Sequence, residues 1–254
     1  MTEGEADSTL PGLTAEGVSF GYRPSRPTIH EFSHAFRTGA VTALLGPNAS
    51  GKSTLLKLLA GLLRPSGGRV QIGARDLRGL TAPLRARQIT YLPPMLRAEF
   101  PLTALEAVRM VGAAAAPAAM ERAQCWALRD RALGSLSGGE RQLVALARAL
   151  AQGSRILLVD EGLSQMDLHH QARIGRLLRE LAGERYTILL VAHDVNLATE
   201  WADECVLLRE GRSVCAGRVE EVVTSENLAL LYPGARLTVG RSPASGAVKV
   251  FFGG

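Results

Sequence analysis

The stretch GPNASGKST, residues 46–54, decides the fold of this chain. It fits the pattern G-x-x-x-x-G-K-[ST] and stands between an apolar run, AVTALLG, and a helical apolar pattern, KSTLLKLLAGLL. Its glycines allow the backbone to curl so that several N–H groups point at phosphate oxygens, and the following helix adds the positive end of its dipole. The sequence therefore predicts a strand, a phosphate-binding loop and a helix in succession.

Two side chains of this loop have specific predicted roles. Lys52 supplies a point charge for the β- and γ-phosphates of a nucleoside triphosphate, and Ser53 offers a hydroxyl to Mg²⁺. The alternative is a glycine-rich turn without a ligand, which the strand before it and the helix after it disfavour. The residues predicted to contact the nucleotide are Gly46, Pro47, Asn48, Ala49, Ser50, Gly51, Lys52, Ser53 and Thr54.

A pair of carboxylates ends the apolar run RILLVDE. Adjacent strand residues point to opposite faces, but at the end of a strand both side chains can reach one site. Phosphoryl transfer needs a carboxylate near the metal and a base that orients the attacking water. We therefore expect Asp160 to bind Mg²⁺ and Glu161 to orient the water. A solvated strand end is the alternative, and the phosphate loop argues against it.

A second glycine motif, LSGGERQ, covers residues 136–142 and precedes a strongly helical stretch. Ser137 is a natural N-cap, and Gly138 and Gly139 leave the start of the helix uncluttered. The result is a second helix terminus able to bind an anion. Because one nucleotide rarely needs two such termini from one subunit, we expect this one to serve a nucleotide bound by another copy.

Strand and helix patterns alternate from AVTALLG to CVLLREG, which predicts a parallel α/β sheet. The runs LTAEGVSFGY and TIHEFSHAF predict two strands before it. Residues 103–130 are alanine-rich and helical in character, with a break expected at Pro117. The tail is less regular, with candidate strands at RLTVG and AVKVFF.

Composition limits the class of protein. The chain has 254 residues, of which 46% are hydrophobic and 21% charged, and this is typical of a globular protein. Cys125, Cys205 and Cys215 are odd in number and lack a C-x-x-C spacing, so we expect free thiols in a reducing cytosol. The net charge of +5 comes without a basic block, so nucleic acid is not an expected partner. No apolar run approaches the ~20 residues that span a bilayer, and the polar, acidic start does not resemble a signal peptide.

The motifs GPNASGKST, LSGGERQ and ILLVDE, in this order, resemble those of the ATPase subunits of ATP-binding cassette (ABC) transporters. The resemblance implies a RecA-like P-loop NTPase core of the α/β class, with an antiparallel β subdomain and a short inserted helical subdomain. It implies a single domain over residues 10–254, with the core at about 10–94 and 140–224, the helical part at about 95–139 and a tail at about 225–254. ATP and Mg²⁺ are the implied cofactors.

In this family two cassettes stack head to tail, and each ATP lies between one phosphate loop and the partner's LSGGE motif, which corresponds to LSGGERQ here and is called the signature motif below. The resemblance therefore implies that Ser137, Gly138, Gly139 and Glu140 contact nucleotide held by a second copy. It also implies a polytopic membrane permease as partner, an indirect link to a substrate-binding protein, and a peripheral position on the cytoplasmic face of the bacterial inner (plasma) membrane.

Three further positions match family positions. Tyr22 matches the aromatic residue that stacks on adenine, and the alternative is a half-buried tyrosine at a strand end. His193 matches the histidine that contacts the γ-phosphate, and the alternative is a helix cap. Asp167 matches the loop that crosses the dimer interface. The resemblance thus implies Lys52, Glu161 and His193 as catalytic residues.

The chain departs from the family pattern at Pro94, in the stretch ITYLPPML, where the family has a glutamine. That glutamine normally reaches Mg²⁺ and the attacking water, and its loop joins the core to the helical subdomain. Proline has no polar side chain and no N–H, and it stiffens the hinge. The segment before the signature motif is also short for the family. We expect ATP to be bound and hydrolysed, but more slowly or with altered coupling to transport.

The cargo is predicted from a longer resemblance. Residues 167–217 and the stretch VVTSENLALLY are similar to the cassettes of bacterial importers for iron-siderophores, heme and cobalamin. The alternatives are a cassette for another cargo, a regulatory or degenerate cassette that binds ATP with weak turnover, and a cassette outside transport. The last usually has two cassettes per chain or long coiled-coil insertions, which this chain lacks.

Overall fold

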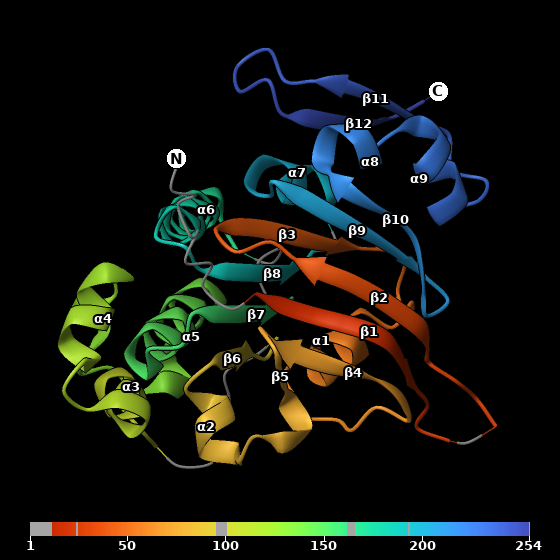
Figure 1. The fold of residues 1–254 in the computed structure, drawn as a ribbon. Helices are drawn as coiled ribbons and strands as arrows, with labels where there is room; N and C mark the ends of the chain where they lie inside the picture. The colour runs from red at the N-terminus through yellow and green to blue at the C-terminus, as the bar shows by residue number, and fades with distance from the viewer. Residues whose placement is uncertain (1–11, 24, 95–100, 162–165, 193, 254) are drawn as a thin grey trace, which may run out of the picture.

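The computed structural model describes residues 12–23, 25–94, 101–161, 166–192 and 194–253. Its centre is a six-stranded sheet in the order β10-β9-β3-β8-β7-β6 (Figure 1). All neighbouring strands run parallel except β10, which pairs antiparallel with β9. The strands are β3 Ala40–Leu45, β6 Ile89–Leu92, β7 Ile156–Asp160, β8 Thr187–Val191, β9 Glu204–Arg209 and β10 Arg212–Arg218. The predicted parallel α/β sheet is thus confirmed.

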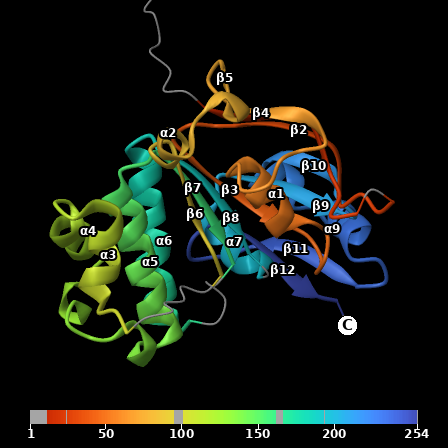
Figure 2. The ribbon, with the colours of Figure 1, turned by 90° about the horizontal axis from the view of Figure 1, so that it is seen from below.

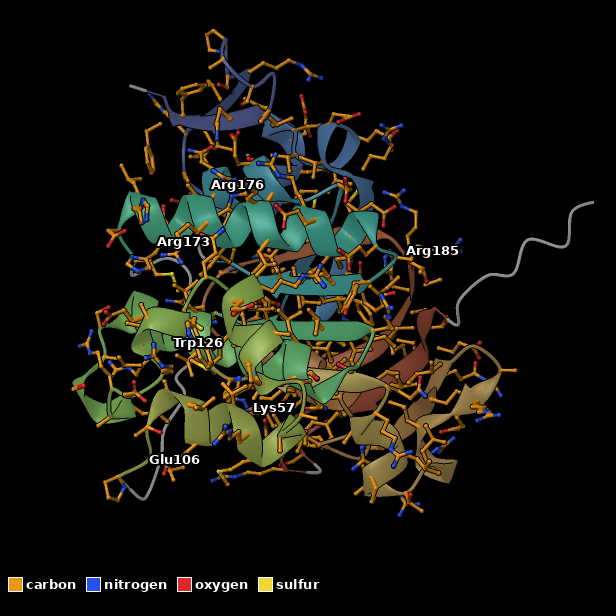
Figure 3. The ribbon with its side chains drawn as sticks, turned by 90° about the vertical axis from the view of Figure 1, so that its left-hand side faces the viewer. Lys57, Glu106, Trp126, Arg173, Arg176 and Arg185 are labelled. Atoms are coloured by element: carbon orange, nitrogen blue, oxygen red, sulfur yellow. The ribbon has the colours of Figure 1, made fainter. Side chains whose placement is uncertain are left out.

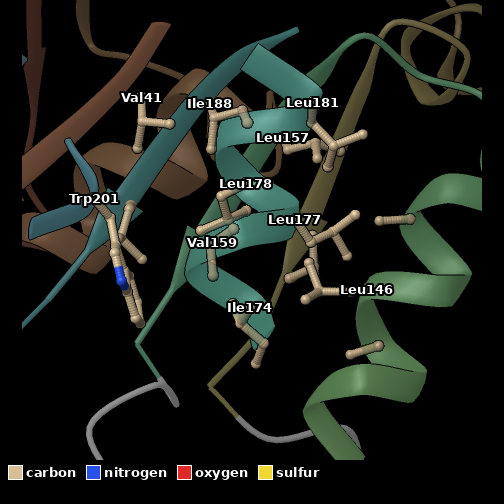
Figure 4. Packing of buried hydrophobic residues seen from close by; sticks show 14 of the residues in the cluster. Val41, Leu146, Leu157, Val159, Ile174, Leu177, Leu178, Leu181, Ile188 and Trp201 are labelled. Atoms are coloured by element: carbon tan, nitrogen blue, oxygen red, sulfur yellow. The ribbon is translucent and has the colours of Figure 1, made fainter. Parts of the chain in front are cut away.

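Both faces of the central strands are buried, which explains why β3, β7 and β8 read as continuous apolar runs. One face packs with α1 (Lys52–Leu59) and the antiparallel strands. The other face packs with α5 (Gly138–Gln152), α6 (Leu168–Gly183) and α7 (Val195–Trp201). Figure 4 shows this second core, where Leu157 and Ile188 of the sheet meet Leu177 and Leu178 of α6. The helices therefore hold the ends of the strands in fixed positions.

A second, antiparallel sheet has the order β2-β1-β4-β5. Its strands are β1 Leu13–Phe20, β2 Ile29–Phe36, β4 Gly67–Ile72 and β5 Arg75–Asp76. Apolar side chains such as Leu13, Val18 and Phe32 are buried against α1. This sheet places the turn that contains Tyr22 beside the first helix, as the hydrogen bond described below shows.

The inserted segment forms a helical lobe, which we define as α3, α4 and α5. The helices α3 (Ala104–Gly112) and α4 (Ala116–Arg122) pack against α5. In Figures 1 and 2 α3 and α4 lie to the left, away from α1. The helical stretch is broken as expected, but the break lies at residues 113–115, just before Pro117, which stands in the first turn of α4. Proline is tolerated there because the first N–H groups of a helix need no partner.

Contacts of α6 tie the helical lobe to the core. Arg173 of α6 donates to the backbone carbonyl of Gln124, just after α4 (Figure 3). Arg122 in α4 pairs with Glu184 at the end of α6, with an N–O distance of 2.5 Å. The lobe is therefore held by the helix that follows the carboxylate pair.

The C-terminal region packs on α7 through a hairpin. Its elements are α8 Val219–Val222, α9 Ser225–Leu231, β11 Leu237–Arg241 and β12 Val248–Phe252. Asn196 of α7 exchanges two hydrogen bonds with the backbone of Val250, at 2.7 and 3.0 Å. The predicted strands of the tail are confirmed, whereas β10, α8 and α9 were not predicted.

The remaining short elements are the helix α2 Ala82–Ala86 and three 3₁₀ helices, η1 Leu77–Gly79, η2 Trp126–Leu128 and η3 Leu133–Ser135. Among the described residues, every helix is too short or too polar to cross a bilayer.

A glycine fixes the approach of α6 to α7. A Cβ atom added at Gly175 would overlap the indole ring of Trp201, which is itself buried. We expect Gly175→Ala to lower the free energy of unfolding by about 1–3 kcal/mol, because overpacking outweighs the gain in helix propensity. Urea denaturation followed by tryptophan fluorescence measures this. Gly183→Ala is the control, since its added Cβ would meet no heavy atom within 4 Å, and an equal loss there would contradict the account.

Candidate active site

The phosphate loop lies between the end of β3 and the start of α1, as predicted. Two glycines are needed there by close packing. A Cβ atom at Gly46 would overlap the carbonyl of Leu208 in β9. Gly51 has a φ of 103°, and its Cβ would come within 2.8 Å of the Ile29 side chain. The neighbouring strands therefore leave no space for a side chain at Gly46 or Gly51.

The amino end of α1 has the features of an anion site. No side chain caps this helix end. The hydroxyl of Ser50 is buried and has no hydrogen-bond partner among the described residues. The backbone N–H groups at this helix end and the hydroxyl of Ser50 are both suited to binding phosphate oxygens. They face a cavity of about 260 Å³ lined by Thr28, Asn48, Ala49, Ser50, Gly51, Lys52, Ser53, Thr54 and Glu161.

Lys52 is the cation of the site, with only 4% of its surface exposed. Its Nζ donates to the carbonyl oxygens of Gly46 and Pro47, both at 2.8 Å. Burial lowers the pKa of Lys52 below its ordinary value, and the nearby charges of Glu161 and Asp160 oppose this shift. The ammonium is thus held at the loop and is positioned to meet phosphate charge.

Asp160 is the most buried carboxylate of the site, at 1% exposure. Its Oδ1 accepts a hydrogen bond from Ser53 Oγ at 2.7 Å, and its Oδ2 accepts one from the hydroxyl of Tyr91 at 2.7 Å. A serine hydroxyl next to a carboxylate is an oxygen donor set that suits Mg²⁺, which takes its remaining ligands from water and substrate phosphates. The residues present therefore fit the predicted metal. No cluster of three or more His, Cys, Asp or Glu side chains competes for it in the described part of the chain.

Tyr91 was missed as a site residue when the sequence alone was read. Its contact with Asp160 follows from the pairing of β6 with β7, in which Tyr91 lies opposite Leu158, two residues before Asp160. Burial and the hydrogen bond to Asp160 raise the pKa of Tyr91, so its hydroxyl keeps its proton and donates.

Glu161 follows Asp160 and lines the same cavity as Lys52. Its φ of 57° is unusual for a residue with a side chain. This left-handed conformation comes directly after the last residue of β7, Asp160. The predicted residue His193 lies outside the described residues, as do residues 162–165.

Tyr22 lies on the antiparallel-sheet side of the site and is 60% exposed. Its ring meets Phe20 edge to face, with centroids 5.0 Å apart. Its hydroxyl is 3.4 Å from Thr54 Oγ1, which anchors the turn to α1. An exposed, anchored aromatic face beside the phosphate loop is suited to stacking on a base.

The second glycine motif begins α5 as predicted. Ser137 accepts a hydrogen bond from the N–H of Glu140, whose carboxylate accepts one from the N–H of Ser137, at 3.2 and 2.7 Å. This capping box fixes the helix start. None of the residues that line the cavity at Lys52 comes from this motif. Within the described part of one chain, the two predicted anion sites are therefore not joined into one pocket.

Asp167 caps α6 and is bound to a second residue that the sequence did not reveal. Its carboxylate oxygens lie 2.9 and 2.8 Å from Nδ1 of His170. The imidazole of His170 covers Gly139, where an added Cβ would lie 2.9 Å from the ring. His170 thus connects the Asp167 cap to the start of α5.

This packing predicts opposite effects at two adjacent glycines. Gly139→Ala should lower the free energy of unfolding by about 1–2 kcal/mol, because the added Cβ would lie too close to the Cγ atom of the His170 ring. Gly138→Ala should raise it by up to about 1 kcal/mol, because its Cβ meets open space and alanine favours the helix. Chemical denaturation measures both changes.

The double variant isolates the cause. In a His170→Ala background, Gly139→Ala should become stabilising, since the ring is gone. A loss of the same size in both backgrounds would show that His170 is not the group that Gly139 accommodates.

Comparison with known proteins identifies the family. The ABC transporter family matches residues 29–164. The hemin import ATP-binding protein HmuV of Agrobacterium fabrum is 35% identical over 249 residues, covering 91% of this chain and 95% of that protein. The cobalamin import ATP-binding protein BtuD of Halobacterium salinarum is 35% identical over 229 residues, covering 85% of this chain but only 57% of that protein. The chain therefore spans little more than half the length of this second relative.

Solved structures agree in fold. One chain, described as from a metal-chelate type ABC transporter in an inward-facing conformation, superposes with a TM-score of 0.80 at 26% identity, covering 96% of this chain and 97% of that chain. An ATP-binding cassette of an ABC transporter in its ADP conformation gives the same TM-score at 22% identity, covering 89% of this chain and 100% of the other. With its phosphate loop, buried carboxylate and signature helix in place, the chain belongs to the ABC transporter family.

Proposed function

We propose that two copies of this chain bind ATP between them and hydrolyse it to drive import through a membrane permease. The observation that supports this most directly is the division of the anion sites. The cavity at Lys52 is lined by the phosphate loop and Glu161, and the signature motif takes no part in its lining. A second copy supplies the missing wall through Ser137, Gly138, Gly139 and Glu140.

In this proposal each group at the cavity has one task. Backbone N–H groups of the loop and Lys52 bind the phosphates, and Tyr22 stacks on adenine. Ser53 and Asp160 hold Mg²⁺, which neutralises charge on the phosphate oxygens when it is bound. Glu161 orients the attacking water and takes up its proton. His193 contacts the γ-phosphate, and Asp167 reaches across to the second copy.

The proposed cargo is a metal chelate such as an iron-siderophore, heme or cobalamin. The relatives named above are import ATP-binding proteins for hemin and cobalamin, and both cargoes are metal-bearing macrocycles. The proposed partners are a polytopic permease and, through it, a substrate-binding protein. The chain would then lie on the cytoplasmic face of the inner membrane, bound through protein contacts. Purifying the chain together with a candidate permease, and measuring which chelate stimulates ATP hydrolysis, tests this assignment.

A cassette that binds ATP without turning it over is the second candidate, and Pro94 is the observation that favours it. Pro94 is exposed and carries no polar side chain. Hydrolysis is favoured instead by Lys52 and Glu161, which line one cavity, and by Asp160, which is hydrogen-bonded to Ser53 in its lining.

Glu161→Gln tests the proposed function most simply. The amide cannot take a proton, so kcat should fall by about 10²–10⁴-fold while ATP still binds. The variant should also form a dimer that depends on ATP, measured by light scattering after size exclusion. Glu121→Gln, on the exposed face of α4, is the control and should behave as wild type. Wild-type turnover in Glu161→Gln would refute the role of this carboxylate.

Pro94→Gln tests the departure from the family pattern. A glutamine can add a hydrogen bond at the metal or the water, and about 1–2 kcal/mol in the transition state corresponds to roughly tenfold in kcat. Steady-state phosphate release and transport measure the effect. Pro101→Gln, exposed in the same connection, serves as the control. Turnover and transport that do not change in Pro94→Gln would contradict a tuning role for this position.

A further inference from the structure

We propose that Tyr91 is a positioning residue for the Asp160 carboxylate, and that it replaces, in part, the contact which Pro94 cannot make. The proposal rests on the function proposed above, because it concerns the same metal and nucleotide. It adds a residue from β6 to a site whose other members come from the phosphate loop and β7.

The carboxylate of Asp160 is held on both sides by hydroxyl groups. Ser53 Oγ lies 2.7 Å from Oδ1, and the Tyr91 hydroxyl lies 2.7 Å from Oδ2. These distances are typical of strong hydrogen bonds to a charged acceptor. With one donor on each oxygen, the plane of the carboxylate is fixed relative to α1 and β6. A metal that binds through Asp160 therefore meets a ligand with a set orientation.

The position of Tyr91 is itself well determined. It is paired in register with β7, and its neighbour Thr90 is buried and lies 2.6 Å from the hydroxyl of Ser154. The amide of Gln152 donates to the backbone carbonyl of Ile89 at 3.2 Å. Because β6 is fixed by its pairing with β7 and by the contacts of the two residues before Tyr91, the tyrosine hydroxyl can act as a rigid donor.

The residues after β6 offer no comparable group before the gap in the described chain. β6 ends at Leu92, and Pro93 and Pro94 follow with apolar side chains and no N–H. In the described part of this connection, Tyr91 is the residue whose side chain reaches the metal carboxylate.

The test uses the full chain, with Mn²⁺ as the metal probe and ADP as the nucleotide, and electron paramagnetic resonance to measure bound Mn²⁺. Tyr91→Phe keeps the ring and removes the hydroxyl. Loss of a group that orients a metal ligand typically weakens metal binding by about 10–100-fold, and we expect about tenfold here. Affinity for ADP without metal should change by less than about twofold, since Tyr91 is not among the residues that line the phosphate cavity.

Tyr232→Phe is the matched control, because Tyr232 is a partly buried tyrosine at the end of α9, away from the phosphate cavity. Thermal melting of each variant shows whether the fold is kept. Mn²⁺ affinity in Tyr91→Phe within about twofold of wild type would overturn the proposal. Failure of the wild-type chain to bind ADP with Mn²⁺ would instead overturn the proposed function itself.

A double variant tests the link to Pro94. In a Pro94→Gln background, the loss caused by Tyr91→Phe should shrink to less than half on a logarithmic scale, because the glutamine supplies a second contact. An undiminished loss in the double variant would overturn the claim that Tyr91 replaces the missing contact.

Discussion

The hydrogen bond between Ser53 and Asp160 is the interaction on which the site depends. Ser53 Oγ in the first turn of α1 lies 2.7 Å from Oδ1 of Asp160 at the end of β7. This bond holds the buried carboxylate next to the phosphate loop. The parallel sheet makes this possible, because β3 and β7 end at the same edge with only β8 between them. Helices on both faces bury the strands, and this packing sets where the two ends lie.

A second constraint arises from the same architecture. The signature helix α5 belongs to the helical lobe and packs against α3 and α4, while the phosphate loop belongs to the sheet. The contact of His170 with Gly139 links the two parts at α6, but the cavity at Lys52 takes none of its lining residues from its own chain's signature motif. In the function proposed above, a dimer with two shared sites resolves this, since each copy would supply the motif that the other copy's cavity lacks.

The sequence was enough to predict what depends on local pattern. The phosphate loop, the strand that ends in Asp160 and the capping box of Ser137 each carry their signal within about ten residues. Contacts that depend on packing between distant segments were missed. Tyr91 meets Asp160 only through the register of β6 and β7, and His170 meets Gly139 only through the packing of α6 on α5. β10 was missed because it is mostly exposed at the sheet edge and shows no apolar alternation. The signal for α9 was present, since Thr224 caps it through the N–H of Asn227.

The central claim is that one hydrolytic site contains residues of two copies. It is tested by mixing two inactive variants, Glu161→Gln and Gly138→Glu. The second should fold, because an acidic side chain favours a helix start and a Cβ there meets open space, yet it places negative charge where phosphate would bind. Mixed dimers would contain one site with both an intact Glu161 and an intact signature motif. We predict that mixing restores about a quarter of wild-type phosphate release, as random pairing requires. Activity no higher than that of the separate variants would show that the site is built within a single chain.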